Sequence, residues 1–461
     1  MSQTTELRTA SDVAPILPRS RFRRWYFRGL LLLVVWGGVE LMAWGLLTLV
    51  LAGGLTSVWI MQDGTLKKSP QGDGVAAHST QAVHPFLGWV RNPDILPGEI
   101  SEGVPLQTSR YGFMDTTDGI HQRRPDRLIV GITGGSVAHY MSVAGADALR
   151  DRLRSVPDFR DREIIIVRLA QLAYKQPQAL FSLNYFLLHG GEFDIVINLD
   201  GYNEIALAMM EGYHWKMALD YPQGWSIRAA EIVDPRDSEV ALRIIELRGA
   251  RQRATQSARQ SPFRWLPTHA LLWYVQERRS QAAMIDAQQE LSQARAGQRS
   301  FLRFGPPATV QNADEALEEC VRLWKQSSLQ MHQICEANHI LYVHAIQPNQ
   351  HDPGSKPLTA EESHFIDLES PLNAHRNYGP VIAQGFPMLR AAGQELRLAG
   401  VRNLDLTSIF SSHAESLYID SCCHVNPTGS QILATAIADY VIEQLPMETP
   451  EAAPSGAGDR R

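Results

Sequence analysis

Short runs of apolar residues alternate with longer mixed stretches between residues 126 and 445. Each run is rich in β-branched residues and almost continuously hydrophobic, which is typical of strands buried on both faces of a parallel sheet. The predicted strands cover residues 127–132, 163–167, 194–199, 340–346 and 401–406. The predicted helices cover residues 147–154, 178–188, 313–337, 381–398 and 429–445. This alternation predicts an α/β domain with a doubly wound, five-stranded parallel sheet.

The interval between the third and fourth predicted strands is unusually long for such a sheet. Two charged stretches within it, residues 238–254 and 270–293, predict a helical insertion at about residues 205–310. Its tryptophans are Trp215, Trp225, Trp265 and Trp273. The insertion is either a cap whose aromatic residues pack on the core, or a lid that faces a membrane or covers a substrate.

A long apolar run near the N-terminus covers residues 29–61 and contains a single charged residue, Glu40. A bilayer core needs about 20 apolar residues, whereas the apolar part of a secretory signal has only about 7–15. The run therefore predicts one transmembrane helix, in which either residues 30–51 or residues 41–61 span the bilayer. Glu40 is then either an edge residue that reaches the interface or a contact with a partner helix.

The charges that flank this run predict its orientation. The arginines before it are Arg19, Arg21, Arg23, Arg24 and Arg28. Only Lys67 and Lys68 follow closely. Because the more positive flank stays in the cytoplasm, the chain after residue 61 is expected outside it. This arrangement indicates a bacterial inner-membrane protein with a periplasmic body, in a compartment that permits disulfides.

The remaining segments are read from their composition. Residues 1–28 are a predicted cytoplasmic arm, residues 62–83 a polar linker, and residues 84–125 an irregular lead-in that packs on the main domain. Residues 446–461 predict a disordered tail. The net charge of −6 gives no overall basic surface, which argues against nucleic acid as the main partner.

Polar residues follow the predicted strands where ligands bind in a doubly wound sheet. Ser136 follows the first strand, Ala173 lies after the second, and Asn203 follows the third. Asp420 and His424 precede the last helix. Each has a plainer interpretation: Ser136 as a turn residue, Asn203 as a helix cap, and Asp420 with His424 as an ordinary loop salt bridge.

Together these residue types suit acyl transfer. A serine hydroxyl becomes nucleophilic when a base such as histidine takes its proton, and a carboxylate can orient the imidazole. The backbone N–H groups of Ser136 and Ala173 and the amide of Asn203 could stabilise the developing oxyanion. The sequence therefore predicts Ser136 as nucleophile, His424 as base and Asp420 as the orienting acid.

These motifs resemble the SGNH/GDSL hydrolase superfamily, in which a serine follows the first strand, Gly-x-Asn the third, and Asp-x-x-His precedes the last helix. The resemblance covers residues 126–445 and implies a flavodoxin-like sheet. It also gives Gly135 and Gly201 supporting roles. Three positions depart from the family pattern. The first block reads Gly-Gly-Ser, Ala173 stands where the family has glycine, and Asp420 lies four residues before His424 instead of three.

Helix geometry limits how the four cysteines can pair. Cys320 and Cys335 share one predicted helix and would lie about 22 Å apart, which is too far for a disulfide. Cys320 lies near the helix end that faces the active-site edge. The hypothesis is a bridge from Cys320 to Cys422 or Cys423, and the alternative is free buried thiols. The spacing of His and Cys residues predicts no metal site, and no cofactor is expected.

The function expected from these residues is that of a membrane-anchored serine esterase or O-acyltransferase of SGNH type. The expected substrate is an acyl ester, acetyl in the first place, of a carbohydrate, with an acyl-enzyme on Ser136. One alternative is a catalytically silent SGNH domain that binds polysaccharide or scaffolds a membrane complex through the region of Glu40. Another is a lipase, which would need an exposed apolar face on the insertion.

Overall fold

The computed structural model describes residues 19–51, 54–67, 81–94, 98–101, 103–117, 119–214, 216–225, 235–292, 305–306, 310–369 and 378–445. The predictions for residues 1–18, for residues 68–80 of the linker and for the tail 446–461 lie outside the described residues.

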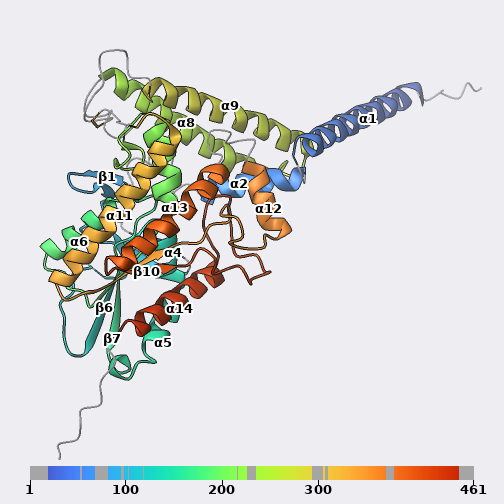
Figure 1. Ribbon diagram of the computed structural model, residues 1–461. Helices are drawn as coiled ribbons and strands as arrows, with labels where there is room; N and C mark the ends of the chain where they lie inside the picture. The colour runs from blue at the N-terminus through green and yellow to red at the C-terminus, as the bar shows by residue number, and fades with distance from the viewer. Residues whose placement is uncertain are drawn as a thin grey trace, which may run out of the picture.

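A five-stranded parallel sheet forms the centre of the domain, as predicted (Figure 1). Its strands are β6 (Arg127–Gly134), β7 (Glu163–Arg168), β8 (Ile195–Asp200), β9 (Leu341–Ile346) and β10 (Arg402–Asp405). Their spatial order is β10-β9-β8-β6-β7, and every neighbouring pair is parallel. Counted from β6, this is the order 2-1-3-4-5, so the direction of winding changes between β6 and β8. Ligands bind at such a switch point.

Two groups of helices cover the sheet. The first group is α4 (Ser136–Ala144), α5 (Ala146–Leu153) and α14 (Pro427–Glu443), which contact one another. The second is α6 (Gln178–Leu188), α11 (Ala313–Ala337) and α13 (Tyr378–Leu398), with α11 in contact with the other two. Shorter elements are η1 (Pro157–Phe159), α12 (Ala360–Glu369) and the π-helix η2 (Asn203–Tyr213). The sequence prediction missed α4, the helix that begins at Ser136.

The segment predicted as an irregular lead-in, together with residues 81–83 of the predicted linker, forms two small antiparallel sheets. One pairs β1 (Gln81–His84) with β2 (Gly88–Arg91), and the other joins β3 (Gly98–Ser101), β4 (Val104–Thr108) and β5 (Met114–Asp115). Trp89 and Phe113 enter the main core. Asp115 forms an ion pair with Arg168 at 2.9 Å, and both side chains are 2% exposed. This pair attaches β5 to the end of β7.

The apolar run at residues 29–61 is divided between two helices, so the predicted bounds of the transmembrane helix are corrected, while the prediction of a single candidate span agrees with the structure. Helix α1 (Arg19–Val50) ends before a turn at Gly54, whose φ of +53° suits glycine, and α2 (Leu55–Lys67) follows. Among the described residues, only Trp25–Val50 is long and apolar enough to cross a membrane. A continuous span over residues 41–61 is therefore excluded. Residues 62–67, predicted as the start of the linker, are helical in α2. Residues 19–28, predicted as part of the cytoplasmic arm, are helical in α1.

The insertion consists of two long helices that lie side by side, α8 (Pro235–Gln260) and α9 (Pro267–Ser292) (Figure 1). They pack on α2 and on the end of α1, and we call these elements together the four-helix unit. Its buried residues form a core of their own: Leu47, Leu51, Val58, Ala258, Ala270 and Trp273. The insertion thus covers the N-terminal helices, whereas the predicted cap would have packed on the core of the sheet.

Glu40 has a partner within this unit. Its carboxylate accepts hydrogen bonds from the backbone N–H and the hydroxyl of Thr268, at 2.9 and 2.6 Å. Thr268 lies in the first turn of α9, where a negative charge is favourable. The helix that contacts Glu40 therefore belongs to the same chain, and Glu40 is not a free edge residue.

Candidate active site

Ser136 lies where β6 passes into α4, and two glycines make this turn possible. Gly134 has a φ of +134°, and a Cβ there would lie 2.1 Å from the carbonyl oxygen of Leu199. A Cβ at Gly135 would lie 2.3 Å from Nδ2 of Asn203. Only glycine fits at either position without a shift of its neighbours. The turn thus places Ser136 at the N-terminus of α4, beside Asn203.

Asp420 organises the loop that precedes α14. Its Oδ1 accepts hydrogen bonds from the backbone N–H groups of Cys422, Cys423 and His424, at 2.9, 3.2 and 3.3 Å. The N–H of Ile419 donates to the carbonyl oxygen of His424 at 3.0 Å, which closes the loop. The four-residue spacing from Asp420 to His424 is accommodated in this way, because the extra residue lies in a turn around the carboxylate.

The three residues of the predicted triad form one chain of hydrogen bonds. Ser136 Oγ lies 2.7 Å from His424 Nε2, although 288 positions separate them in the sequence. His424 Nδ1 lies 2.6 Å from Asp420 Oδ2. Ser136 is 8% exposed, and the His424 and Asp420 side chains are 22% and 18% exposed. The three side chains are therefore mostly, but not completely, shielded from water.

Asn203 joins the loops that follow β7 and β8. It is the first residue of η2, and the N-cap position before it is occupied by Tyr202. Its Nδ2 donates to the carbonyl oxygen of Tyr174 at 2.7 Å. An amide nitrogen carries two hydrogens, so one hydrogen bond to Tyr174 leaves a second donor beside Gly135 and Ser136.

Ala173 occupies a conformation that favours glycine. Its φ is +65°, in the left-handed region, where a Cβ costs about 1–2 kcal/mol. The sequence departure at this position therefore has a structural cost. The following residue, Tyr174, holds the loop in place through its carbonyl contact with Asn203 and a hydroxyl hydrogen bond to the carbonyl oxygen of Trp89. Gly201 directly follows β8 and has a φ of +133°, so it allows a turn like the one that Gly134 makes at the end of β6.

Sequence reasoning missed a group that holds the triad loop from the end of β9. Asn349 Nδ2 donates to the carbonyl oxygen of Cys422 at 2.9 Å, and Gln350 Nε2 to that of Asp420 at 2.7 Å. His351 Nε2 lies 2.7 Å from the carbonyl oxygen of Ser421. The polar run Gln-Pro-Asn-Gln-His directly after the fourth strand is the signal that marks this group.

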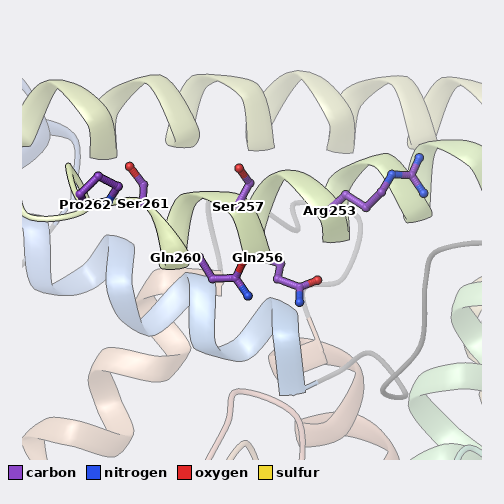
Figure 2. Close-up of a pocket in the computed structure, with 6 residues that line it drawn as sticks. All are labelled: Arg253, Gln256, Ser257, Gln260, Ser261 and Pro262. Atoms are coloured by element: carbon purple, nitrogen blue, oxygen red, sulfur yellow. The ribbon is translucent and has the colours of Figure 1, made fainter.

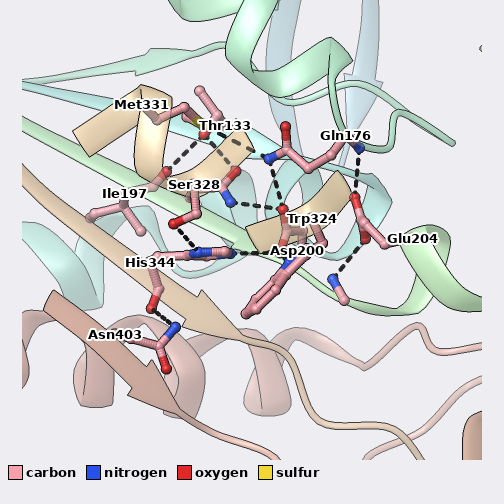
Figure 3. Close-up of polar contacts among 12 residues, drawn as sticks. Thr133, Gln176, Ile197, Asp200, Glu204, Trp324, Ser328, Met331, His344 and Asn403 are labelled. Atoms are coloured by element: carbon pink, nitrogen blue, oxygen red, sulfur yellow. Dashed lines mark hydrogen bonds and ion pairs between the residues drawn. The ribbon is translucent and has the colours of Figure 1, made fainter. Parts of the chain in front are cut away.

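A buried polar network underlies the strand ends (Figure 3). Asp200 Oδ1 accepts from Trp324 Nε1 at 2.6 Å and lies 2.8 Å from His344 Nε2, while Oδ2 accepts from Asn198 Nδ2 at 2.7 Å. Burial opposes ionisation here, but the His344 imidazole and the other donors lower the pKa of Asp200. Burial, reinforced by the charge of Asp200, raises the pKa of Glu204 to about 8. The network fixes the residue immediately before Gly201.

All four cysteines are free thiols, which corrects the predicted bridge from Cys320 to Cys422 or Cys423. Cys320 is buried near Lys175 and Glu204, and burial raises its pKa to about 12. Cys422 and Cys423 instead lie in the triad loop, with their sulfurs 3.3 Å apart. The groups that interact with Cys320 thus differ from those that interact with Cys422 and Cys423, and the helix geometry alone could not show this.

One group among the described residues could hold a metal ion. Cys422, Cys423 and His424 each offer a ligand atom, and these atoms lie within 4.8 Å of one another. Both nitrogens of His424 already contact Ser136 and Asp420. A metal ion bound through His424 would therefore break the hydrogen-bond chain described above.

A separate hollow of about 590 Å³ lies on α8 (Figure 2). It is lined by Arg253, Gln256, Ser257, Gln260, Ser261 and Pro262. None of the residues predicted for catalysis lines it.

No family model matches the chain, and no curated protein matches it in sequence. The resemblance to the SGNH/GDSL superfamily therefore rests on the residues and their arrangement alone.

Proposed function

We propose that this protein is a membrane-anchored, extracytoplasmic serine esterase or O-acyltransferase of SGNH type. The observation that carries the proposal is the continuous hydrogen-bond chain from Ser136 Oγ through His424 to Asp420. It lies at the switch point of the sheet, where a doubly wound fold binds ligands. The same constellation performs acyl transfer on unrelated folds.

In the proposed mechanism, His424 Nε2 takes the proton of Ser136 as Oγ attacks the acyl carbonyl carbon. Asp420 Oδ2 holds the other ring nitrogen and stabilises the imidazolium. The N–H groups of Ser136 and Ala173 and the second amide hydrogen of Asn203 stabilise the oxyanion. His424 then protonates the departing alcohol, which leaves an acyl ester on Ser136. Water or an acceptor hydroxyl, deprotonated by His424, completes hydrolysis or transfer.

The proposed substrate is an O-acyl ester, acetyl in the first place, of a carbohydrate. Within the SGNH/GDSL superfamily, the chain most resembles membrane-anchored bacterial members, which are often linked to the modification of surface polysaccharides, and this resemblance supports the substrate class. The arginines before the apolar helix support an orientation with the catalytic domain in the periplasm. Hydrolysis and transfer would use the same residues, and the acceptor alone distinguishes them.

The test combines covalent labelling with turnover in the full-length, detergent-solubilised chain. A fluorophosphonate probe should label the wild-type protein, and the protein should hydrolyse para-nitrophenyl acetate. Both signals should be lost in Ser136→Ala. The matched control is Ser142→Ala, a second serine of α4 whose hydroxyl donates to the carbonyl oxygen of His139, and it should retain both.

Equal labelling of Ser136→Ala and the wild type would refute Ser136 as nucleophile. A folded wild-type protein with neither labelling nor turnover would favour the catalytically silent domain instead.

A further inference from the structure

The end of the insertion nearest α1 carries exposed apolar side chains. We call residues 261–275 the insertion tip; they comprise the turn between α8 and α9 and the first turns of α9. Its exposed apolar residues, with their exposed fractions, are Phe263 (60%), Trp265 (58%), Leu272 (71%) and Val275 (40%). Exposed apolar clusters of this kind mark contact surfaces.

The insertion tip is attached to the apolar helix at a defined position. Glu40 of α1 accepts two hydrogen bonds from Thr268, and Ala270 and Trp273 share a buried core with Leu47. Trp265 also packs edge-on against Trp59 of α2, with ring centroids 4.9 Å apart. These contacts fix the height of the tip along α1.

The position of the insertion tip along α1 lies inside the bilayer. The helix from Arg28, the last charge before Glu40, rises about 18 Å at about 1.5 Å per residue. The hydrocarbon core of a bilayer is about 30 Å thick. With Arg28 at its inner edge, Glu40 lies about 12 Å below the outer edge, and any tilt of α1 places it deeper. Thr268, which is bonded to Glu40, shares this depth.

Along α8 and α9, exposed side chains change from apolar near the tip to polar and charged farther from it, as expected where a helix leaves the hydrocarbon core. Along α9, exposed apolar residues end at Val275, and the exposed cation Arg279 lies about 16 Å from Thr268, at about 1.5 Å per residue. The polar hollow begins at Ser261 and Pro262 of the tip and continues along α8 to Arg253 (Figure 2). Arginines at the positions of Arg253 and Arg279 are suited to the zone between acyl chains and phosphates. At the tip itself, the Arg264 guanidinium lies 4.6 Å from the centre of the Trp265 ring.

We propose that the insertion tip is embedded in the outer leaflet of the bilayer that α1 spans. Phe263, Trp265 and Leu272 then contact acyl chains, while Arg253 and Arg279 lie among the lipid phosphates. This inference rests on the membrane anchoring included in the proposed function. The tip and α1 would both enter the membrane, and they share one buried core. Two such attachments would hold the catalytic domain at a fixed orientation to the membrane surface.

The experiment uses the full-length chain in vesicles of phosphatidylethanolamine and phosphatidylglycerol. Phe263→Cys and Leu272→Cys are each labelled with the environment-sensitive dye NBD. The controls are Leu188→Cys and Leu398→Cys, whose native side chains are 84% and 91% exposed at the ends of α6 and α13. The labelled wild-type chain gives the background from Cys422. Because the tip follows α1 into either leaflet, the orientation in the vesicle does not affect the result.

Phospholipids that carry a nitroxide on the acyl chain should quench the dye at positions 263 and 272 several-fold more than at 188 and 398. Equal quenching at all four positions in protein that floats with the vesicles would overturn the embedded tip and leave the anchor intact. Protein that does not float with the vesicles would overturn the anchor itself. The labelling of Ser136 is measured independently of both outcomes.

Discussion

His424 and Asp420 have different tasks within one hydrogen-bond chain. In the proposed mechanism the imidazole moves a proton at every step and the carboxylate orients the ring; the carboxylate also binds three backbone N–H groups of its loop. We expect His424→Ala to lower kcat by about 10³-fold or more, and Asp420→Ala to lower it by a smaller factor. Only Asp420→Ala should also lower the melting temperature, because it frees the loop.

Steady-state kinetics with para-nitrophenyl acetate and thermal unfolding followed by circular dichroism measure the two effects. A larger loss of kcat in Asp420→Ala than in His424→Ala would contradict the assigned roles.

Ala173 offers a second test at the scale of one residue. Because its φ is +65°, replacement by glycine removes a cost of about 1–2 kcal/mol, offset by about 0.5–1 kcal/mol of extra freedom in the unfolded chain. Ala173→Gly should therefore raise the free energy of unfolding by up to about 1 kcal/mol. The control is Ala170→Gly in the same loop, where φ is not positive and the side chain is buried; it should destabilise.

Urea unfolding of both variants gives the comparison. If Ala173→Gly lost as much stability as Ala170→Gly, the left-handed backbone at Ala173 would not be the native conformation.

At the scale of elements, the buried network joins α11 to β8 and β9. Trp324 donates to the charged Asp200 at 2.6 Å, whereas Trp273 of α9 donates to the neutral hydroxyl of Thr255 at 3.2 Å. Both indoles are buried. Hydrogen bonds to charged groups contribute about 1.5–3 kcal/mol, and neutral ones about 0.5–1.5. Trp324→Phe should therefore destabilise the fold more than Trp273→Phe, as measured by chemical unfolding.

An equal loss of stability in the two tryptophan variants would mean that Asp200 finds another donor when Trp324 is removed.

The elements that could be predicted from the sequence are those whose pattern is local. The five strands were recognisable because each is a continuous apolar run, and the long helix α11 because its apolar positions recur at helical spacing. The strands β1 to β5 have two to five residues each, too few for a period, and they depend on turns and on packing against Tyr174. The break at Gly54 likewise depends on packing of α2 against α8 and α9.

The residues of the candidate site also differ in how far the sequence could predict them. Ser136, Asn203 and His424 follow or precede predicted elements, so topology alone brings them to one edge. The support from Asn349 and Gln350 consists of side-chain contacts to a loop about 70 residues away. Such contacts produce no periodic pattern in the sequence. The position of Cys320 relative to Cys422 also depends on side-chain direction, which helix length does not give.

For the whole molecule, the decisive prediction concerns topology. With the arginine-rich flank in the cytoplasm, alkaline phosphatase fused after residue 85 should be active, because this enzyme folds only outside the cytoplasm. A cytoplasmic reporter fused at the same position should be inactive. The reverse pattern would place the catalytic domain in the cytoplasm, although it would leave the geometry of the site unchanged.

The contacts of residues 81–115, which lie between the anchor and the central sheet, determine how proteolytic cleavage would affect the protein. Gln171 Nε2 donates to the carbonyl oxygen of Gly112 at 2.6 Å, and Tyr174 and Gln178 bind the carbonyl oxygens of Trp89 and Leu87. A protease that cuts between residues 68 and 80 would leave these contacts intact, and the core that α8 and α9 share with α1 and α2 would still hold the domain at the anchor. A cut after residue 115 would separate, in the chain, the strands that hold the loop around Ala173 from the domain that contains it. The place of cleavage would thus decide whether the cleaved protein stays active.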